Sequence, residues 1–267
     1  MSQNPTSTQD DSFARFVENM HCRLKAHARA VRRTLKNRPN RFRGPFATRE
    51  DAALAVPAET PVGYDNDEVT EVSYKRLCQL EPWDKPVVKW LQWLAPRRVL
   101  DAGGHMGTKY RAFRPHLDLD RVEWTVYDVP AIVRAGRERA QQDGLTKLKF
   151  SNDLAQAPAA EVLLASGMLP YLDEPLSAFL SRLPNRPNFL LLNKVATHRG
   201  PDVYLLENFG VAEVPYLVRN QADFESTLLS HGYALEETWN IDPLSHLIPG
   251  GGWCSYRGYA ARLIATS

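Results

Sequence analysis

The sequence has few of the residues that mark secreted, membrane-spanning or metal-binding proteins. Its three cysteines, Cys22, Cys78 and Cys254, are odd in number and far apart. This spacing argues against a disulfide framework and against a Cys-x-x-Cys metal site. No apolar run approaches the length of a membrane span, and the polar N-terminus lacks the apolar core of a signal peptide. The histidines are scattered without a His-x-x-x-His or His-Glu pair, so we expect no metal site. The cysteine usage favours a reducing, cytoplasmic location.

Net charge is also small, at +2, but the charges are unevenly spread. Residues 1–50 hold eleven Lys and Arg against four Asp and Glu. Within them, 12–35 has apolar residues at helical spacing with basic residues between, which predicts a basic amphipathic helix. We expect this helix to dock on the rest of the chain or on a second copy in a homo-oligomer. Peripheral attachment to the inner membrane face ranks second, and nucleic-acid binding is not expected because no aromatic-rich basic groove accompanies the helix.

The most informative stretch is 97–107, Arg-Arg-Val-Leu-Asp-Ala-Gly-Gly-His-Met-Gly. An apolar strand runs into a glycine-rich turn, and a helix is predicted over 108–117. Such a turn presents backbone N–H groups and a helix dipole to an anionic or polar ligand. The dinucleotide fingerprint Gly-x-Gly-x-x-Gly fails from either Gly103 or Gly104.

What remains is the pattern Asp101-x-Gly103-Gly104-x-x-Gly107. An acid at the strand end, two residues before the first glycine, resembles the S-adenosylmethionine (SAM) sites of class I methyltransferases. In those sites a carboxylate lies near the ammonium group of the ligand. The alternative is that the glycines serve only the steric needs of a strand-to-helix turn.

A second carboxylate supports a nucleotide-type site. The strand predicted over 122–127 ends at Asp128, about where nucleotide-binding folds place an acid for the ribose hydroxyls. Asp128 could instead only cap the helix that begins at Pro130. The two roles are compatible, because both need the carboxylate at this strand end.

The remaining pattern alternates strands with helices and then changes. Helices are expected over 130–143, 175–183 and 221–231, and strands over 147–151, 161–166 and 188–193. Two successive strands, 234–241 and 256–264, are joined by a Pro- and Gly-rich loop, which suggests an antiparallel pair at a sheet edge. We therefore predict an α/β fold with a Rossmann-like, seven-strand mixed sheet and a terminal antiparallel pair. Residues 62–267 would form this domain, and 1–61 an N-terminal helical extension with a connector.

Several short segments together resemble one family. They are Phe42-Arg-Gly-Pro-Phe, Gly63-Tyr64-Asp65, the 99–107 segment, Trp124-Thr-Val-Tyr-Asp-Val-Pro, Ser166-Gly-Met-Leu-Pro-Tyr-Leu and Tyr256-Arg-Gly-Tyr. Over 42–265 the chain is similar to a small bacterial family of class I methyltransferases, often encoded with cell-surface polysaccharide genes, whose chemistry is largely inferred. The resemblance implies SAM as cofactor. Asp101, Gly103, Gly104 and Gly107 would then hold its methionine moiety, Asp128 its ribose, and Asn152 and Asp153 its adenine. His105 departs from the pattern, because it replaces a residue that is small in many such turns.

Catalytic candidates must lie at the carboxyl ends of the strands. Lys194 and His198 follow the expected fifth strand, and either could act as a general base toward a hydroxyl acceptor. The alternative for both is a solvated residue at the rim of the site. Tyr171 is expected to pack against the sheet.

Three hypotheses for function follow. The first is a SAM-dependent methyltransferase acting on an oxygen of a small molecule or glycan. The second is a nucleotide-dependent oxidoreductase or sugar-modifying enzyme, which the glycine spacing and the terminal strand pair disfavour. The third is a non-catalytic relative of the fold that binds SAM or only a partner.

Overall fold

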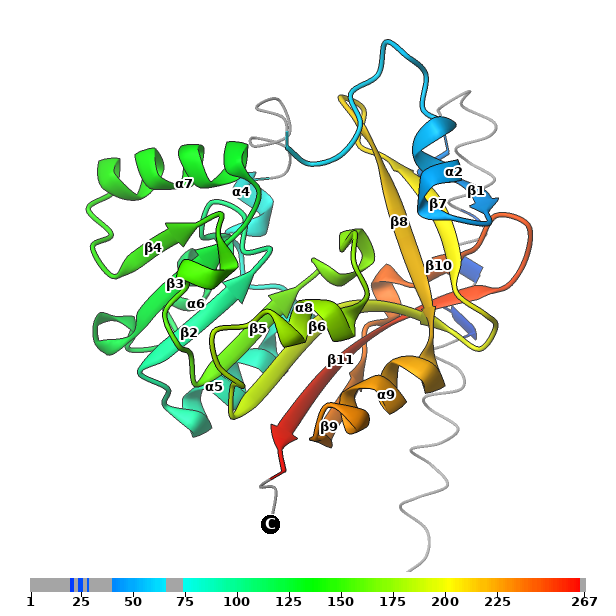
Figure 1. Cartoon of the computed structure of the whole chain (residues 1–267). Helices are drawn as coiled ribbons and strands as arrows, with labels where there is room; N and C mark the ends of the chain where they lie inside the picture. Colours follow the sequence, from blue (N-terminus) through cyan, green and yellow to red (C-terminus); the bar gives the residue numbers. More distant parts are fainter. Residues whose placement is uncertain (1–19, 22–23, 26–27, 29–39, 66–73, 265–267) are drawn as a thin grey trace, which may run out of the picture.

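The computed structural model describes residues 40–65 and 74–264, together with 20, 21, 24, 25 and 28. Its main feature is a mixed sheet of seven strands (Figure 1). From edge to edge the strands are β4 (Leu148–Ser151), β3 (Glu123–Tyr127), β2 (Arg98–Ala102), β5 (Val162–Ser166), β6 (Phe189–His198), β11 (Trp253–Leu263) and β9 (Tyr233–Asn240). The first five are parallel, whereas β11 runs antiparallel to both neighbours. The predicted fold class, with its terminal antiparallel pair, is confirmed.

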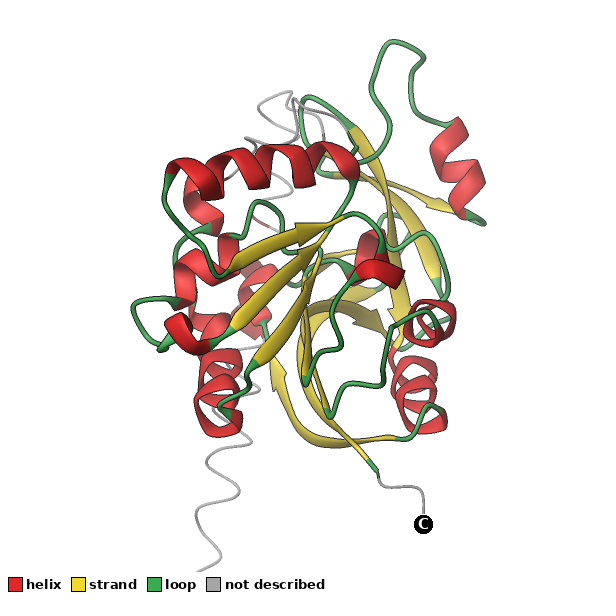
Figure 2. Cartoon of the chain, turned by 60° about the vertical axis from the view of Figure 1, so that its left-hand side comes forward, coloured by secondary structure: helices red, strands yellow, loops and turns green. Residues whose placement is uncertain are grey.

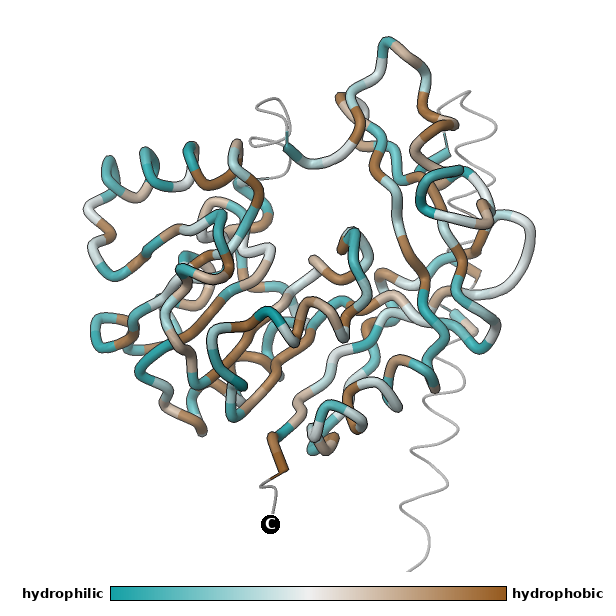
Figure 3. Tube along the Cα trace, in the orientation of Figure 1, coloured by the Kyte–Doolittle hydropathy of each residue, from teal (hydrophilic) through white to brown (hydrophobic). Residues whose placement is uncertain are grey.

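Helices cover both faces of this sheet, as Figure 2 shows. On one face lie α5 (Lys85–Leu94), α6 (Thr108–Phe113) and α7 (Pro130–Gln142), and on the other α8 (Leu176–Ser181) and α9 (Gln221–Ser230). The central strands are buried on both sides, which explains why their sequences are continuous apolar runs. In Figure 3 these strands are mostly brown, while α7 is largely teal.

A second, smaller sheet was not predicted. It consists of β1 (Phe42–Phe46), β7 (Val203–Asn208) and β8 (Glu213–Asn220), all antiparallel, with the short helix α2 (Arg49–Leu54) in contact with each of them. It joins the main sheet where the end of β8 pairs with the end of β6. The segment interpreted as a connector therefore contains a strand and a helix that belong to the fold. Its Pro and Gly residues obscured the strand signal, because strands usually exclude them.

The strand predicted over 188–193 is longer than expected, and this corrects the position of two candidate residues. Lys194 and His198 do not follow the fifth strand but lie within β6, which ends at His198. The strand continues past the polar Asn193 because 195–197 pair with β11, sixty residues later in the chain. Cross-strand pairing thus overrides the polar break that the sequence shows.

The N-terminal helix is only partly described. Met20, His21, Leu24, Lys25 and Ala28 are helical, and Met20 and Leu24 are exposed. The other positions of the helix predicted over 12–35 lie outside the described residues, so its docking stays a prediction. No helix in the described part of the chain is long and apolar enough to cross a membrane.

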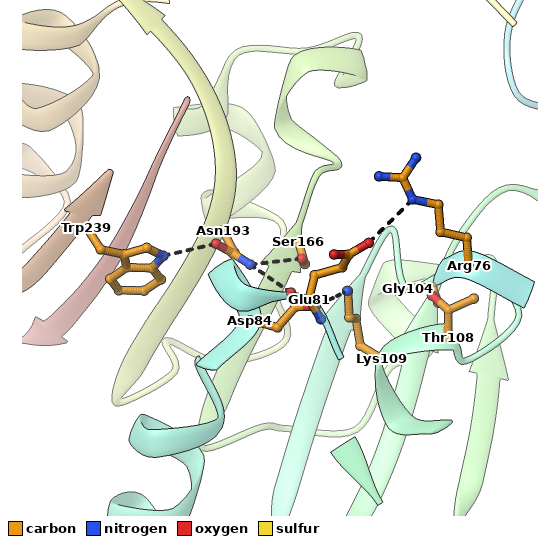
Figure 4. A network of polar contacts seen from close by, with 9 residues as sticks. All are labelled: Arg76, Glu81, Asp84, Gly104, Thr108, Lys109, Ser166, Asn193 and Trp239. Atoms are coloured by element: carbon orange, nitrogen blue, oxygen red, sulfur yellow. Dashed lines mark hydrogen bonds and ion pairs between the residues drawn. The ribbon is translucent and has the colours of Figure 1, made fainter. Parts of the chain in front are cut away.

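A buried ion pair connects the helical layer to the carboxyl ends of the strands (Figure 4). Lys109 Nζ of α6 lies 2.7 Å from Asp84 Oδ2, and both side chains are almost fully buried. Asn193 Nδ2 of β6 donates to Asp84 Oδ1 at 3.1 Å, and the Trp239 indole donates to Asn193 Oδ1 at 3.2 Å. The Glu81 amide donates to Asp84 Oδ2 at 3.2 Å. Three donors, Lys109 of α6, Asn193 of β6 and the nearby Glu81 amide, thus converge on one carboxylate.

Removing that carboxylate should strongly destabilise the fold. Asp84→Ala leaves the Lys109 ammonium buried without its ion partner, and we expect the free energy of unfolding to fall by about 3–5 kcal/mol. The double variant Asp84→Leu/Lys109→Met removes both charges and should lose less. Urea unfolding measures both. Asp118→Ala, which breaks the exposed pair with Arg121, is the matched control and should cost under about 1 kcal/mol. A loss for Asp84→Ala no larger than for the control would contradict this role.

Candidate functional site

The glycine turn follows β2 at the carboxyl edge of the sheet, as predicted. Its glycines are required by the packing of the chain itself. A Cβ on Gly103, where φ is 68°, would lie 2.5 Å from Cβ of Met168, and a Cβ on Gly107, where φ is 72°, would lie 2.5 Å from Leu148 Cδ2. A Cβ on Gly104 would collide with the carboxylate of the preceding acid. The glycines therefore have a steric role in the turn, while their contact with a cofactor stays a prediction.

The carboxylate of Asp101 is fully buried at the end of β2. Its Oδ2 accepts a hydrogen bond from the Trp124 indole at 3.0 Å, while its Oδ1 has no hydrogen-bond partner among the described residues. Burial raises the pKa of Asp101 to about 7, although the indole hydrogen bond and the positive charges of Lys109 and Lys194 oppose that shift. A buried acceptor left unpaired is costly, so this oxygen is suited to receive a donor from a ligand.

The carboxylate of Asp128 lies at the end of the neighbouring strand and reaches the glycine turn. Its Oδ1 accepts from the Val129 amide and its Oδ2 from the His105 amide, both at 2.8 Å. Burial raises the pKa of Asp128 to about 6, against these two backbone hydrogen bonds. A carboxylate has about four acceptor positions, so capacity remains for two hydroxyl donors. Asp128 thus holds the Val129 amide and the glycine turn without exhausting its acceptors. The Ala131 amide in the first turn of α7 is bonded by Asp65 instead, so the alternative that Asp128 caps this helix is wrong.

His105 takes the left-handed backbone conformation that a glycine usually supplies in such a turn. Its φ is 56°, and its amide is the group that donates to Asp128. The ring stacks on Tyr74 at a centroid distance of 6.4 Å. This stacking places the ring against α4 (Tyr74–Leu77) and shows how the turn accommodates a large side chain.

The two residues predicted to face adenine differ in what they contact. Both lie directly after β4, next to Asp128, because Tyr127 pairs with Ser151. Asp153 uses its carboxylate locally: Oδ1 accepts from the Ala155 amide at 3.0 Å and Oδ2 from Gln156 at 2.9 Å. Asn152 is exposed beside it and is the better placed of the two to meet a ligand.

Lys194 is the candidate base that the fold brings to the glycine turn. It occupies a β-bulge, because one extra residue of β6 lies between the pairs Leu192–Tyr259 and Val195–Arg257, and its φ is 57°. The end of its side chain lies against Gly167, directly after β5. Burial of the ammonium, together with Lys109 nearby, lowers the pKa of Lys194 to about 7. Bulges commonly re-aim a side chain beside active sites, and here the end of the Lys194 side chain lies against Gly167, where its charge and that of Asp101 influence each other's pKa.

His198 does not join this group. His198 ends β6, five residues beyond Asn193, which lies next to Lys194 in the same strand. Five residues of a strand span up to about 17 Å. His198 Nε2 lies 2.5 Å from the Pro201 carbonyl oxygen. It lines a different cavity, together with Trp253 and Arg257. The structure therefore separates the two catalytic candidates that the sequence placed side by side.

An aromatic cluster beside the site was not predicted as a unit. The ring of Tyr64 lies 4.9 Å from that of Tyr171 and 5.2 Å from that of Phe209, between centroids, and all three residues are partly exposed. The Tyr171 hydroxyl donates to Glu207 Oε2 at 2.5 Å, and Arg41 donates to Glu207 Oε1 at 2.7 Å. The expectation that Tyr171 packs on the sheet is incomplete, since it also carries this polar contact. The members of the cluster come from segments far apart in the sequence. Of the cluster's three rings, the sequence showed Tyr64 and Tyr171 only as parts of separate short motifs.

Asp65, which follows Tyr64 in the chain, connects the aromatic cluster to the region of the carboxylates. Asp65 Oδ1 accepts from the Ala131 amide at 2.8 Å, at the N-terminus of α7, and its negative charge contributes to the raised pKa of Asp128. Tyr171 is three residues after Met168, which packs on Gly103. In Figure 1 the small sheet rises opposite the carboxyl ends of the parallel strands, with α2 on its outer side. Asp65 and Met168 thus link the aromatic cluster along the chain to the start of α7 and to the glycine turn.

Comparison with known proteins supports the fold alone. No protein-family model and no curated protein matches the sequence. Among solved structures, the chain is similar to a Burkholderia thailandensis 1,6-didemethyltoxoflavin-N1-methyltransferase, with 18% identity, a TM-score of 0.52, and coverage of 84% of this chain and 93% of that one. A magnesium protoporphyrin IX methyltransferase from Synechocystis PCC 6803 matches with 16% identity, a TM-score of 0.50, and coverage of 75% and 96%. The fold is that of SAM-dependent methyltransferases.

Proposed function

We propose that the protein is a SAM-dependent methyltransferase that acts on an oxygen of a small-molecule or glycan acceptor. The observation that carries this proposal is the buried Oδ1 of Asp101, which lacks a partner within the described residues at the end of β2. The amino-acid ammonium of SAM would supply the missing charge-assisted donor. The methyltransferase fold places this oxygen at the edge of the sheet where ligands of such folds bind.

The residues present fit this cofactor. Asp101 would hold the ammonium, Asp128 the ribose diol through its remaining acceptor positions, and Asn152 the adenine edge. When bound, SAM supplies an electrophilic methyl group on a sulfonium. The protein then has only to orient an acceptor oxygen toward that methyl and to accept its proton.

Lys194 and the aromatic cluster would perform those two tasks. A lysine with a pKa of about 7 is partly neutral at physiological pH and can take a proton from a hydroxyl. The partly exposed rings of Tyr64, Tyr171 and Phe209 offer apolar faces on which an acceptor can stack. Membership of the bacterial family linked to polysaccharide genes, a cytoplasmic location and attachment through the N-terminal helix remain proposals beside this one.

Two measurements test the proposal. Calorimetry on the full-length protein should detect binding of S-adenosylhomocysteine, the product cofactor, and no comparable binding of NAD, which distinguishes it from an oxidoreductase. Transfer of labelled methyl from SAM to small molecules or glycans of a cell extract should then exceed that of the Lys194→Met variant. Binding without turnover would support the non-catalytic alternative, and preferential NAD binding would overturn the proposal.

The first variant to test is Asp101→Ala, which should weaken S-adenosylhomocysteine binding by about 1–3 kcal/mol through loss of a charged hydrogen bond. Asp101→Asn keeps an oxygen for Trp124 and removes only the charge. The ligand ammonium favours the ionised carboxylate, so wild-type affinity should rise between about pH 6 and pH 7.5, as Asp101 with its pKa of about 7 loses its proton. Calorimetry across this range should show a smaller rise for Asp101→Asn. Equal rises in both proteins would remove the ammonium contact from the proposal.

A second pair of variants separates the ligand role of Asp128 from its role in holding the Val129 and His105 amides. Asp128→Ala should weaken cofactor binding by about 1–3 kcal/mol, because two ribose hydroxyls lose their acceptor. Asp128→Glu should be partly tolerated. Thermal melting without ligand measures the backbone role separately. If Asp128→Ala lowers the melting temperature but leaves affinity intact, the residue has only this structural role.

The third test concerns the proton acceptor. Lys194→Met should lower kcat for the identified acceptor by about 10²–10⁴-fold and abolish a rate increase centred near pH 7, where the amine becomes neutral. His198→Ala should leave kcat nearly unchanged. Independently of any acceptor, the pH dependence of acetylation at Lys194, followed by mass spectrometry with exposed Lys147 as reference, should have a midpoint near 7. A Lys194→Met enzyme with the wild-type pH profile would show that another group takes the proton.

A further inference from the structure

A second cavity lies away from the glycine turn, at the far end of β6. Its volume is about 720 Å³, within the range of small-molecule sites. It is a half-open cavity lined by the end of β6, the start of β11 and the loop 248–252, which lies beside β10 (His246–Leu247) in Figure 1. His198, assigned above to neither cofactor nor acceptor, is part of its wall. The proposed methyl transfer leaves this cavity without a role.

One lining residue is Arg257, which lies on β11 opposite Asn240 of β9 and Val195 of β6. Its Nε atom is buried and has no hydrogen-bond partner among the residues that the structure describes. An N–H of a charged guanidinium left unpaired away from water costs more than a neutral one. A guanidinium also presents its donors in a planar fork that matches carboxylate and phosphate oxygens. The unpaired donor therefore indicates a ligand oxygen that carries negative charge.

The rest of the wall is compatible with such a ligand. Arg199 adds a second positive charge at the exposed rim, while Asp242 opposes it with one negative charge. Three consecutive glycines, 250–252, with φ of 85°, 126° and 95°, also line the cavity. Without side chains they allow a ligand to approach the backbone closely. Asn240 and Gln221 contribute neutral polar side chains.

We propose that this cavity binds a small ligand bearing an oxyanion, either a phosphate or a carboxylate, with Arg257 as the central contact and Arg199 at the rim. The site is separate from the Asp101 turn, and the proposal holds whether or not the protein transfers methyl groups. Because phosphate and carboxylate share the same fork geometry, the guanidinium alone does not choose between them.

The test uses the full-length protein with pyrophosphate and citrate as separate probes, followed by calorimetry and thermal melting. We expect saturable binding of one probe, in the millimolar range or tighter, that sodium chloride at the same ionic strength does not reproduce. Arg257→Gln should weaken it by about ten- to hundredfold, and Arg257→Lys by less. Arg262→Gln is the matched control, because Arg262 lies on the same strand but is exposed and paired with Glu236.

The results separate the interpretations clearly. Stronger binding of pyrophosphate assigns a phosphorylated ligand, and stronger binding of citrate a carboxylated one. Equal binding by wild type, Arg257→Gln and Arg262→Gln would overturn the proposal, as would a shift that chloride reproduces or an absence of saturation. If Arg257→Gln does not fold, Arg257→Lys and Arg199→Gln carry the test, and wild-type affinity in both would likewise overturn it.

Discussion

The arrangement of the site depends on one buried contact, the ion pair between Asp84 and Lys109. A charge buried without its partner costs several kcal/mol, so the segments that carry these residues must meet for the chain to fold. Asn193 joins the same carboxylate and, through its own oxygen, the Trp239 indole. The network thus fixes α6, which follows the glycine turn, relative to the bulge in β6 that carries Lys194. The positions of the Asp101 and Asp128 carboxylates and of the Lys194 amine therefore depend on the Asp84–Lys109 ion pair, which bonds to none of the three.

The same burial that stabilises this edge of the sheet makes its ionisable groups unusual. Asp101, Asp128 and Lys194 lie within one desolvated region, and each has a pKa shifted toward neutrality by burial. They differ in their hydrogen bonds. Both oxygens of Asp128 are used by backbone amides, whereas one oxygen of Asp101 is unpaired among the described residues. Strongly perturbed titrating groups gathered at one strand edge are typical of functional sites, and the unpaired oxygen indicates which part of the ligand belongs there.

The small sheet of β1, β7 and β8 contributes residues to the aromatic cluster and to the second cavity. It brings Glu207 and Phe209 from one hairpin next to Tyr171 from the end of the central sheet, and Tyr64 closes the group from the N-terminal side. Its other end pairs with β6 and so forms a wall of the second cavity near His198. One inserted hairpin therefore contributes to both places where a second ligand could bind.

The sequence by itself determined the strands of the central sheet, its terminal antiparallel pair and the carboxylates at the ends of β2 and β3, because runs buried on both faces and turns rich in glycine are local signals. It placed Lys194 just after the fifth strand, whereas the residue lies within β6. Only the tertiary structure decided that Lys194 lies in a bulge with its side chain against Gly167, and that His198 lines a different cavity. The extension of β6 and its bulge depend on β11, because Ser255 and Arg257 of β11 pair with Thr197 and Val195, some sixty residues earlier in the sequence. Small strands such as β1 and β7 are likewise stabilised by cross-strand partners and not by their own composition, so no local pattern could reveal them.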